Sequence, residues 1–283
     1  MNQIITPELR QWLTQQAAEG HSRQSVLDAL LKAGWQPETA ALALESEWDE
    51  QQRQRTAAAT ARLPAQRLPD LDLARSPRQM DAGDRWVDVI ATLAAPRVVV
   101  LGNLLSADEC DALVAAARPR LARSLTVQTQ TGGEELNPDR TSQGMFFSRG
   151  ESELLTRIEA RIGRLLNWPV DHGEGMQVLR YGAGAQYKPH YDYFDPAEPG
   201  TPSIVKRGGQ RVGTLVMYLN TPEKGGGTTF PDVHVEVAPQ RGNAVFFSYE
   251  RPHPSTKTLH GGAPVIAGEK WIATKWLRER EFK

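Results

Sequence analysis

The chain has a single cysteine, Cys110, among its 283 residues. It therefore forms no internal disulfide and cannot hold a metal through a set of cysteines. An excess of charge of one sign is also lacking, because 33 lysines and arginines face 34 aspartates and glutamates. That balance gives no indication of a general nucleic-acid-binding or membrane-binding surface, so neither kind of partner is expected.

Long hydrophobic runs are lacking as well, and none is long enough to span a bilayer. The first residues, MNQIITPELRQWL, do not combine a basic stretch with an apolar core. We therefore expect no secretory signal peptide and a cytoplasmic location. Hydrophobic residues nonetheless make up 40% of the chain, which is enough for a substantial core.

Three segments of different character follow one another. Residues 1–50 predict a small unit of three short helices, opened by Pro7, Ser22 and Pro37. This unit resembles ubiquitin-associated helical modules in size and pattern; it is expected to be a docking module for a protein partner or a solubilising appendage. Residues 51–80, rich in Gln, Arg, Ala and Pro, predict a linker. Residues 81–283 are long enough for a catalytic domain.

The pattern within residues 81–283 predicts an α+β fold. A β-branched run at 96–101 predicts a strand, Ser106 is a suitable helix cap, and residues 151–166 form an amphipathic helical pattern. Short strands with Gly and Pro turns then follow: Met176–Tyr181, Tyr187–Tyr193, Arg211–Leu219, His234–Val237, Ala244–Ser248 and Trp271–Leu277. This order predicts a double-stranded β-helix (jelly roll) with flanking helices.

A His-x-Asp pair and a distant histidine suggest a metal site. His190 and Asp192 are two residues apart, so on an extended strand they point to the same face. Together with His260 they would hold one side of a metal ion and leave the other side open, an arrangement typical of non-haem Fe(II) oxygenases. A 2-oxo acid and O₂ can occupy the open side, and Lys270 offers a cation for an anionic cosubstrate. The remaining histidines lack such neighbours and are expected to be ordinary: His21, His172, His234 and His253.

Five separated motifs resemble the prolyl 4-hydroxylase branch of the 2-oxoglutarate/Fe(II) dioxygenases over roughly residues 96–280. They are 177–194 (QVLRYGAGAQYKPHYDYF), 208–220 (GGQRVGTLVMYLN), 225–231 (GGGTTFP), 242–247 (GNAVFF) and 260–276, which begins HGG and ends KWIATKW. The resemblance implies Fe(II), 2-oxoglutarate and O₂ as cofactors, with ascorbate as a further candidate. Residues 1–80 lie outside it.

The resemblance also assigns roles to matching positions. Tyr181 and Thr228 are implied to hold the 2-oxoglutarate carboxylate together with Lys270. Substrate positioning is implied for Tyr187, Arg211 and Trp276. Arg278 departs from some relatives, which have a histidine there. Two further segments, 128–143 and the Gly- and Pro-rich 195–210, are expected to be loops that cover the substrate.

These observations predict a dioxygenase that hydroxylates a prolyl residue in a peptide or protein and releases succinate and CO₂. Two alternatives stay open at this point. One is a hydroxylase of a free amino acid or another small molecule. The other is a non-catalytic metal-binding module that recruits partners through its N-terminal helices. The intact metal-ligand set and Lys270 favour catalysis over the second alternative.

Overall fold

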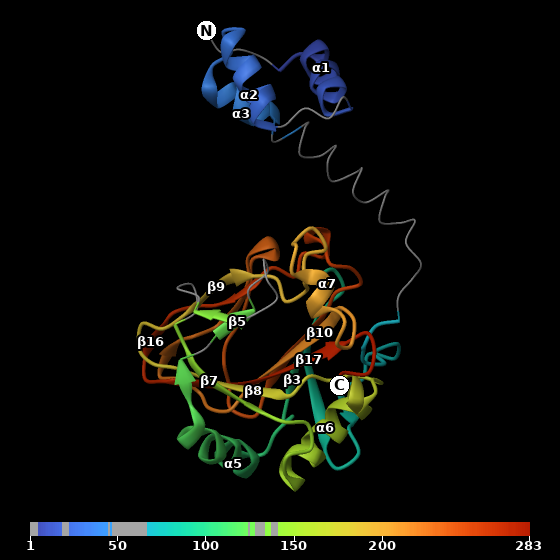
Figure 1. The fold of residues 1–283 in the computed structure, drawn as a ribbon, viewed down its shortest axis with the longest axis vertical. Helices are drawn as coiled ribbons and strands as arrows, with labels where there is room; N and C mark the ends of the chain where they lie inside the picture. The colour runs from blue at the N-terminus through green and yellow to red at the C-terminus, as the bar shows by residue number, and fades with distance from the viewer. Residues whose placement is uncertain are drawn as a thin grey trace. The chain divides into compact units, whose positions relative to one another are not determined.

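The computed structural model describes residues 5–18, 23–44, 46, 67–123, 125–127, 134–136 and 141–283. By its contacts the chain divides into two compact units, Met1–Ala65 and Gln66–Lys283 (Figure 1). No helix in these described ranges has both the length and the hydrophobicity that a bilayer span requires.

The first unit contains three short helices, α1 (Pro7–Ala18), α2 (Arg23–Lys32) and α3 (Pro37–Ala43). They meet around a small apolar core made of Leu9, Leu13, Val26, Leu30, Ala40, Ala43 and Leu44. Gly34 lets the chain turn between α2 and α3, because its φ of 86° lies in the left-handed region that favours glycine.

The second unit begins earlier than the sequence pattern suggests. Residues 67–80 were expected to belong to a linker, but Leu71 is buried in the core of this unit. The Asp70 carboxylate accepts a hydrogen bond of 2.8 Å from Arg97 Nε. Residues 79–81 form the first strand, β1 (Gln79–Asp81). The linker prediction for 51–66 lies outside the described residues.

The larger of the sheets, the major sheet, has nine strands in the order β1-β2-β3-β14-β10-β17-β8-β7-β4. Every neighbouring pair is antiparallel. The strands after β1 are β2 (Trp86–Leu93), β3 (Arg97–Gly102), β4 (Ala122–Arg123), β7 (Gln143–Phe147), β8 (Met176–Tyr181), β10 (Arg211–Tyr218), β14 (Ala244–Ser248) and β17 (Lys270–Arg278).

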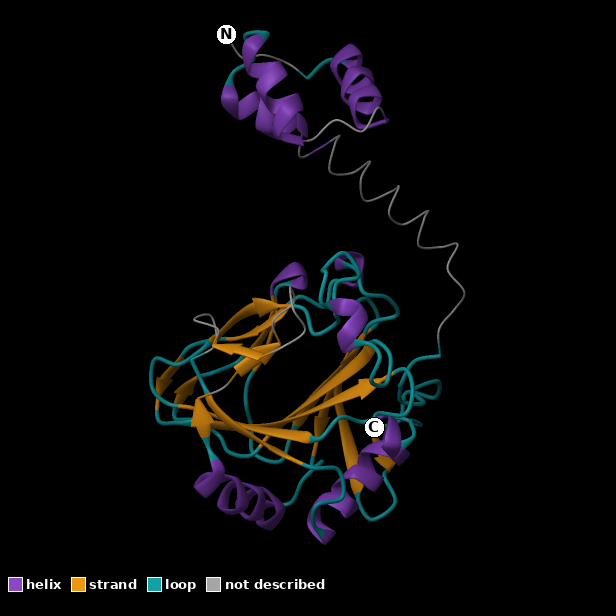
Figure 2. Ribbon diagram, in the orientation of Figure 1, coloured by secondary structure: helices purple, strands orange, loops and turns teal. Residues whose placement is uncertain are grey.

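A minor sheet of four strands has the order β13-β12-β15-β9. Its strands are β9 (Tyr187–His190), β12 (Thr228–Phe230), β13 (Val235–Val237) and β15 (His260–Gly262). Two short pairs complete the strands: β5 (Leu125–Val127) with β6 (Glu134–Leu136), and β11 (Lys224–Gly225) with β16 (Val265–Ala267). Among the described residues of this unit, the other elements are α5 (Ala107–Ala117), α6 (Glu153–Leu165), α7 (Thr201–Ile204) and four 3₁₀ turns, Arg118–Arg120, Val170–His172, Pro231–Val233 and Pro254–Thr256. The two main sheets, drawn in orange in Figure 2, confirm the predicted jelly roll.

Side-chain alternation along the strands of the major sheet builds two cores. In β10, Leu215 and Met217 belong to a core shared with α5 (Ala107–Ala117) and α6 (Glu153–Leu165). Val216 and Tyr218 face the other way and pack with residues of the minor sheet such as Phe230. Figure 1 accordingly shows α5 and α6 on the side of the major sheet that lies away from β9. The space between the sheets is therefore lined by alternate residues of β10 and its neighbours.

The helix α5 begins at a capping box. The Ser106 hydroxyl accepts a 3.1 Å hydrogen bond from the Glu109 main-chain nitrogen, and the Glu109 carboxylate accepts a 2.9 Å bond from the Ser106 nitrogen. Glu109 also pairs with Arg161 of α6 at 2.8 Å. The predicted cap thus both begins α5 and orients the carboxylate that joins it to α6.

We expect Ser106→Ala to lower the free energy of unfolding of the second unit by about 1 kcal/mol, since it leaves the Glu109 N–H without its acceptor. Urea unfolding followed by tryptophan fluorescence measures this loss. Ser255→Ala is the matched control: Ser255 is exposed, and its substitution should change stability by less than about 0.5 kcal/mol. Equal stability of the two variants would contradict the capping role.

Candidate metal centre

Three predicted ligands meet between the sheets. His190 ends β9 and His260 begins β15, and the two residues are paired across these antiparallel strands. The distance from Asp192 Oδ1 to His190 Nε2 is 3.5 Å, and from Asp192 Oδ2 to His260 Nε2 it is 3.4 Å. The candidate ligand atoms of all three residues lie within 4.8 Å of one another. One metal ion can therefore be held by all three.

Asp192 reaches this position from a bend, not from a strand. The expected strand Tyr187–Tyr193 ends at His190, and Asp192 follows it in the bend. Its carboxylate is oriented from the major sheet, where Thr214 Oγ1 donates to Oδ2 at 2.8 Å and Trp276 Nε1 donates to the same oxygen at 2.9 Å. Asp192 thus lies with the two histidines as predicted, although the strand boundary used for that prediction was wrong.

Both histidines have the tautomer that metal binding requires. Nδ1 of His190 lies 2.9 Å from the Lys188 carbonyl oxygen, and Nδ1 of His260 lies 2.9 Å from the Thr258 carbonyl oxygen. A carbonyl only accepts hydrogen bonds, so each Nδ1 carries the proton and each Nε2 keeps a lone pair on the side of Asp192.

The protonation states of His190 and Asp192 are also those that binding of a metal cation requires. Burial lowers the pKa of His190, and the neighbouring His260 lowers it further, which favours a neutral imidazole. Thr214 Oγ1 and Trp276 Nε1 both donate hydrogen bonds to the Asp192 carboxylate, which favours its ionised form. Neutral imidazoles and an ionised carboxylate are the forms that bind Fe(II). The donor set therefore fits the iron site implied by the sequence.

The implied cosubstrate residues line the same cavity as the metal ligands. Lys270 is only 2% exposed and is paired across β17 and β8 with Tyr181. Its Nζ lies 5.6 Å from the centre of the Tyr181 ring and 5.9 Å from that of Tyr218. Thr228 faces this group too, and its hydroxyl accepts a 2.8 Å bond from Tyr218 Oη.

The Lys270 ammonium forms no ion pair with any carboxylate in the described part of the chain. Burial lowers its pKa to about 8, although the charge of Glu236 opposes this shift. A buried cation without a close partner is costly unless a ligand supplies the anion. A cavity lined by both Lys270 and the three metal ligands fits a ligand that chelates a metal and carries a distal carboxylate, as 2-oxoglutarate does.

The predicted substrate residues lie near the metal centre, and each of the three has a partner within the protein. Tyr187 stacks on His190 with ring centres 3.7 Å apart. Trp276 donates to Asp192, as described above, so it also orients a metal ligand. Arg211 pairs with Glu174, with Nε 2.7 Å from Oε1 and Nη2 3.0 Å from Oε2.

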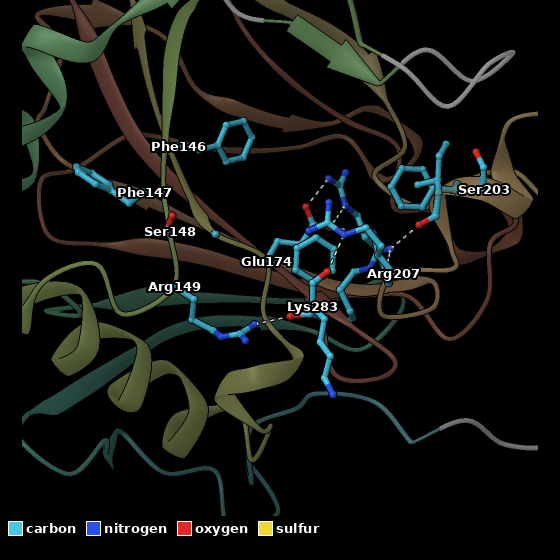
Figure 3. Close-up of a pocket in the computed structure, with 14 residues that line it drawn as sticks. Phe146, Phe147, Ser148, Arg149, Glu174, Ser203, Arg207 and Lys283 are labelled. Carbon is cyan, nitrogen blue, oxygen red and sulfur yellow. Dashed lines mark hydrogen bonds and ion pairs between the residues drawn. The ribbon is translucent and has the colours of Figure 1, made fainter.

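Arg211 and Glu174 also line a second, larger cavity of about 770 Å³ (Figure 3). Glu174, Thr214 and Tyr218 were not predicted as site residues from the sequence. Alternation along the 211–219 strand places Thr214 and Tyr218 on the same face as Val216, and that signal could have identified them. No local sequence pattern could have identified Glu174 as a site residue, because its partners come from strands distant in the sequence.

The two expected covering loops are described to different extents. In 195–210, the Asp195 carboxylate accepts a 2.8 Å bond from the Ala197 nitrogen, and the Gln210 side chain bonds the Phe194 main chain at 2.7 and 2.8 Å. This segment is thus held by local hydrogen bonds and contains α7. In 128–143, residues 128–133 and 137–140 lie outside the described residues. Covering of the substrate by either loop stays a prediction.

Fold and site together define a dioxygenase that uses Fe(II) and 2-oxoglutarate, and comparison with known proteins agrees. Residues 176–278 match the profile of the 2OG-Fe(II) oxygenase superfamily. Over 222 residues the chain is 40% identical to probable prolyl 4-hydroxylase 3 of Arabidopsis thaliana, covering 71% of this chain and 75% of that protein. It is also 40% identical to prolyl 4-hydroxylase 5 of the same plant over 222 residues, covering 71% and 74%.

Among solved structures, a viral collagen prolyl hydroxylase from Paramecium Bursaria Chlorella virus-1 in complex with 2OG is similar, with 31% identity and a TM-score of 0.50. The match covers 64% of this chain and 95% of that one. The chain belongs to the prolyl 4-hydroxylase branch of the 2OG-Fe(II) oxygenase superfamily. Its predicted cofactors, Fe(II), 2-oxoglutarate and O₂, are those of this superfamily.

We expect Trp276→Phe to weaken Fe(II) binding about 10- to 100-fold, since it keeps an aromatic ring but removes the N–H that orients Asp192. Anaerobic competition titration with a metal-sensitive dye measures the affinity. Trp86→Phe, at an exposed tryptophan, should leave it unchanged, and His260→Ala should abolish binding at the site. Unchanged affinity in Trp276→Phe would show that this bond does not support the ligand.

The affinity for 2-oxoglutarate should fall as pH rises through about 8, because Lys270 loses the charge that attracts the cosubstrate. Well above that pH the loss should approach tenfold per pH unit, roughly the slope of a single titration. Anaerobic calorimetry on the Fe(II)-loaded protein measures this. Lys270→Ala should bind weakly at every pH and lose the dependence, whereas Lys32→Ala in the first unit should behave as wild type. A pH-independent affinity in the wild type would contradict the assignment.

Proposed function

We propose that this dioxygenase hydroxylates a prolyl residue in a peptide or protein, with succinate and CO₂ as coproducts. The observation that carries the proposal is one cavity that joins His190, Asp192 and His260 to the buried ammonium of Lys270. Curated relatives at 40% identity are named prolyl 4-hydroxylases, which supports proline as the substrate residue.

When bound, Fe(II) with 2-oxoglutarate and O₂ supplies the oxidising chemistry that replaces a C–H hydrogen by a hydroxyl group. The residues of the chain do the rest. His190, Asp192 and His260 would hold the iron from one side, and the carbonyls of Lys188 and Thr258 fix the imidazole orientation. This arrangement leaves the positions opposite the protein ligands for the cosubstrates.

Lys270 would bind the distal carboxylate of 2-oxoglutarate, with the hydroxyls of Tyr181 and Thr228 as further donors. Thr228 already accepts a hydrogen bond from Tyr218, so its own proton is available for a bound carboxylate. Aliphatic side chains from the major sheet, Leu179, Val216 and Ile272, line the cavity beside these groups. They limit water around the cosubstrate, which strengthens its attraction to Lys270.

The second cavity supports a peptide as substrate in preference to a free amino acid. Its volume of about 770 Å³ is larger than a single proline requires, and falls in the range of drug-sized ligand sites. It adjoins the metal centre through Arg211, whose Nη1 donates to the Asp192 carbonyl at 3.4 Å. Arg211, which lies 4.0 Å from the centre of the Trp276 ring, therefore lies between the iron site and space for flanking residues.

We also propose a cytoplasmic location, ascorbate as an additional reductant, and a protein partner for the helices of the first unit. The last is supported by the exposed Leu31 and Leu42, which leave apolar surface on that unit.

Incubation of the purified protein with Fe(II), 2-oxoglutarate and air tests the function. We expect succinate formation and a peptide mass gain of one oxygen atom with a proline-containing peptide, and no gain when alanine replaces the proline. His190→Ala should be inactive. Oxygen transfer only to free proline would favour the small-molecule alternative, and no succinate under any condition would favour a binding module.

A further inference from the structure

The second cavity has an unusual charge balance. Its charged side chains are those of Arg149, Arg207, Arg211, Arg278 and Lys283, against a single acidic side chain, that of Glu174. We call it the cationic cavity. Figure 3 shows Arg149, Glu174 and Arg207 arranged around it. The charges come from separate parts of the chain, so only the fold brings them together.

Two buried guanidinium groups share the one carboxylate. Arg211 binds both oxygens of Glu174, at 2.7 and 3.0 Å, and Arg278 Nη1 binds Oε1 at 3.0 Å. Burial alone would raise the pKa of Glu174, but the two arginines outweigh it and keep the carboxylate ionised. One negative charge cannot neutralise two positive ones, so this buried cluster keeps a net positive charge.

The other two arginines donate to main-chain oxygens instead of acidic side chains. Arg149 Nη1 donates to the carbonyls of Asp171, Gly173 and Phe282 at 3.1, 3.1 and 2.8 Å. Arg207 Nε donates to the main-chain oxygen of Lys283 at 2.7 Å. Neither pairs with an acidic side chain within the residues that the structure describes.

One buried donor of the cluster is unused. Arg278 is 2% exposed, and its Nε has no hydrogen-bond partner. A buried N–H without an acceptor costs about 1–3 kcal/mol, and more when the group is charged. The excess charge and the unused donor both suit an anionic ligand.

The cationic cavity lies beside the reacting position. The Arg211 guanidinium carbon is 4.0 Å from the centre of the Trp276 ring, which in turn bonds the Asp192 carboxylate. Phe146, which is 49% exposed, lines the cavity with its ring centre 6.4 Å from that of Trp276. A peptide with its proline at the metal centre would therefore place neighbouring residues in the cationic cavity.

We propose that the cationic cavity receives a carboxylate of the substrate close in sequence to the target proline, so that the enzyme prefers acidic prolyl peptides. This inference rests on the proposed function. Guanidinium groups suit the task because their planar fork matches the two oxygens of a carboxylate. The carboxylate comes from an Asp or Glu side chain or from a free peptide C-terminus, and the chemistry of the two is the same.

A peptide series tests the charge preference. Peptides of equal length with one central proline carry Glu, Gln or Lys on both sides of it, with blocked ends. A fourth, Gln-flanked peptide ends in a free carboxylate soon after the proline. Binding to the Fe(II)- and 2-oxoglutarate-loaded protein is measured anaerobically by fluorescence anisotropy, and hydroxylation is measured in air by mass spectrometry.

We expect the Glu peptide to bind about tenfold more tightly than the Gln peptide, which corresponds to about 1.4 kcal/mol, and the Lys peptide to bind more weakly than both. The difference should appear in KM more than in kcat and shrink with added salt. A gain for the free-carboxylate peptide equal to or above that of the Glu peptide would identify the terminus as the source of the anion.

Two arginine variants connect the preference to the cavity. Arg278→Gln should reduce the Glu-over-Gln ratio towards one, and the exposed Arg207→Gln should reduce it in part without disturbing the core. Arg75→Gln is the matched control, because Arg75 is exposed and lines neither cavity. If Arg278→Gln does not fold, the wild-type peptide series and Arg207→Gln decide the result.

The outcomes separate this inference from the proposed function. Equal binding and equal turnover of the Glu, Gln and Lys peptides would overturn the charge preference and leave prolyl hydroxylation standing. Tighter binding of the Glu peptide without hydroxylation of any peptide would support the cavity assignment and count against the proposed function. A full Glu preference retained in both arginine variants, or no peptide binding at all, would also overturn the inference.

Discussion

The carboxylate of Asp192 is the point on which the rest of the site depends. It faces Nε2 of both histidines, and its Oδ2 accepts hydrogen bonds from Thr214 and Trp276 of the major sheet. Its own carbonyl accepts from Arg211. Iron site, major sheet and cationic cavity are therefore connected through one residue, and a change in the bend that carries it would disturb all three.

Buried charge is the second constraint. Lys270 on the cosubstrate side and the Glu174–Arg211–Arg278 cluster on the substrate side are each short of negative charge in the described part of the protein. Such groups destabilise a fold unless a ligand completes them, so their presence is more readily explained by binding than by stability. Lys270 and the Glu174–Arg211–Arg278 cluster both lie beside the same metal centre. The negative charge would come from 2-oxoglutarate for Lys270 and from an acidic peptide for the cluster.

Local patterns in the sequence were sufficient for most elements of the second unit. The strands at 176–181 and 244–248 match the structure, as does the helix capped by Ser106, because apolar alternation and capping act over a few residues. The strand through Asp192 was predicted too long, since a bend set by contacts with β10 and β17 leaves no local signal. The segment 67–80 was assigned to a linker because its composition is polar, yet burial of Leu71 attaches it to the core.

The sequence by itself determined the class of chemistry. Iron binding requires side chains of particular types, here His190, Asp192 and His260, and binding of an anionic cosubstrate requires a cation, here Lys270. The sequence also determined the jelly-roll architecture, through the order of its short alternating strands. Only the tertiary structure decided which groups share a cavity and how their charges balance. Glu174 pairs with arginines 37 and 104 residues away, and electrostatic energy depends on distance in space, which the order of residues does not specify.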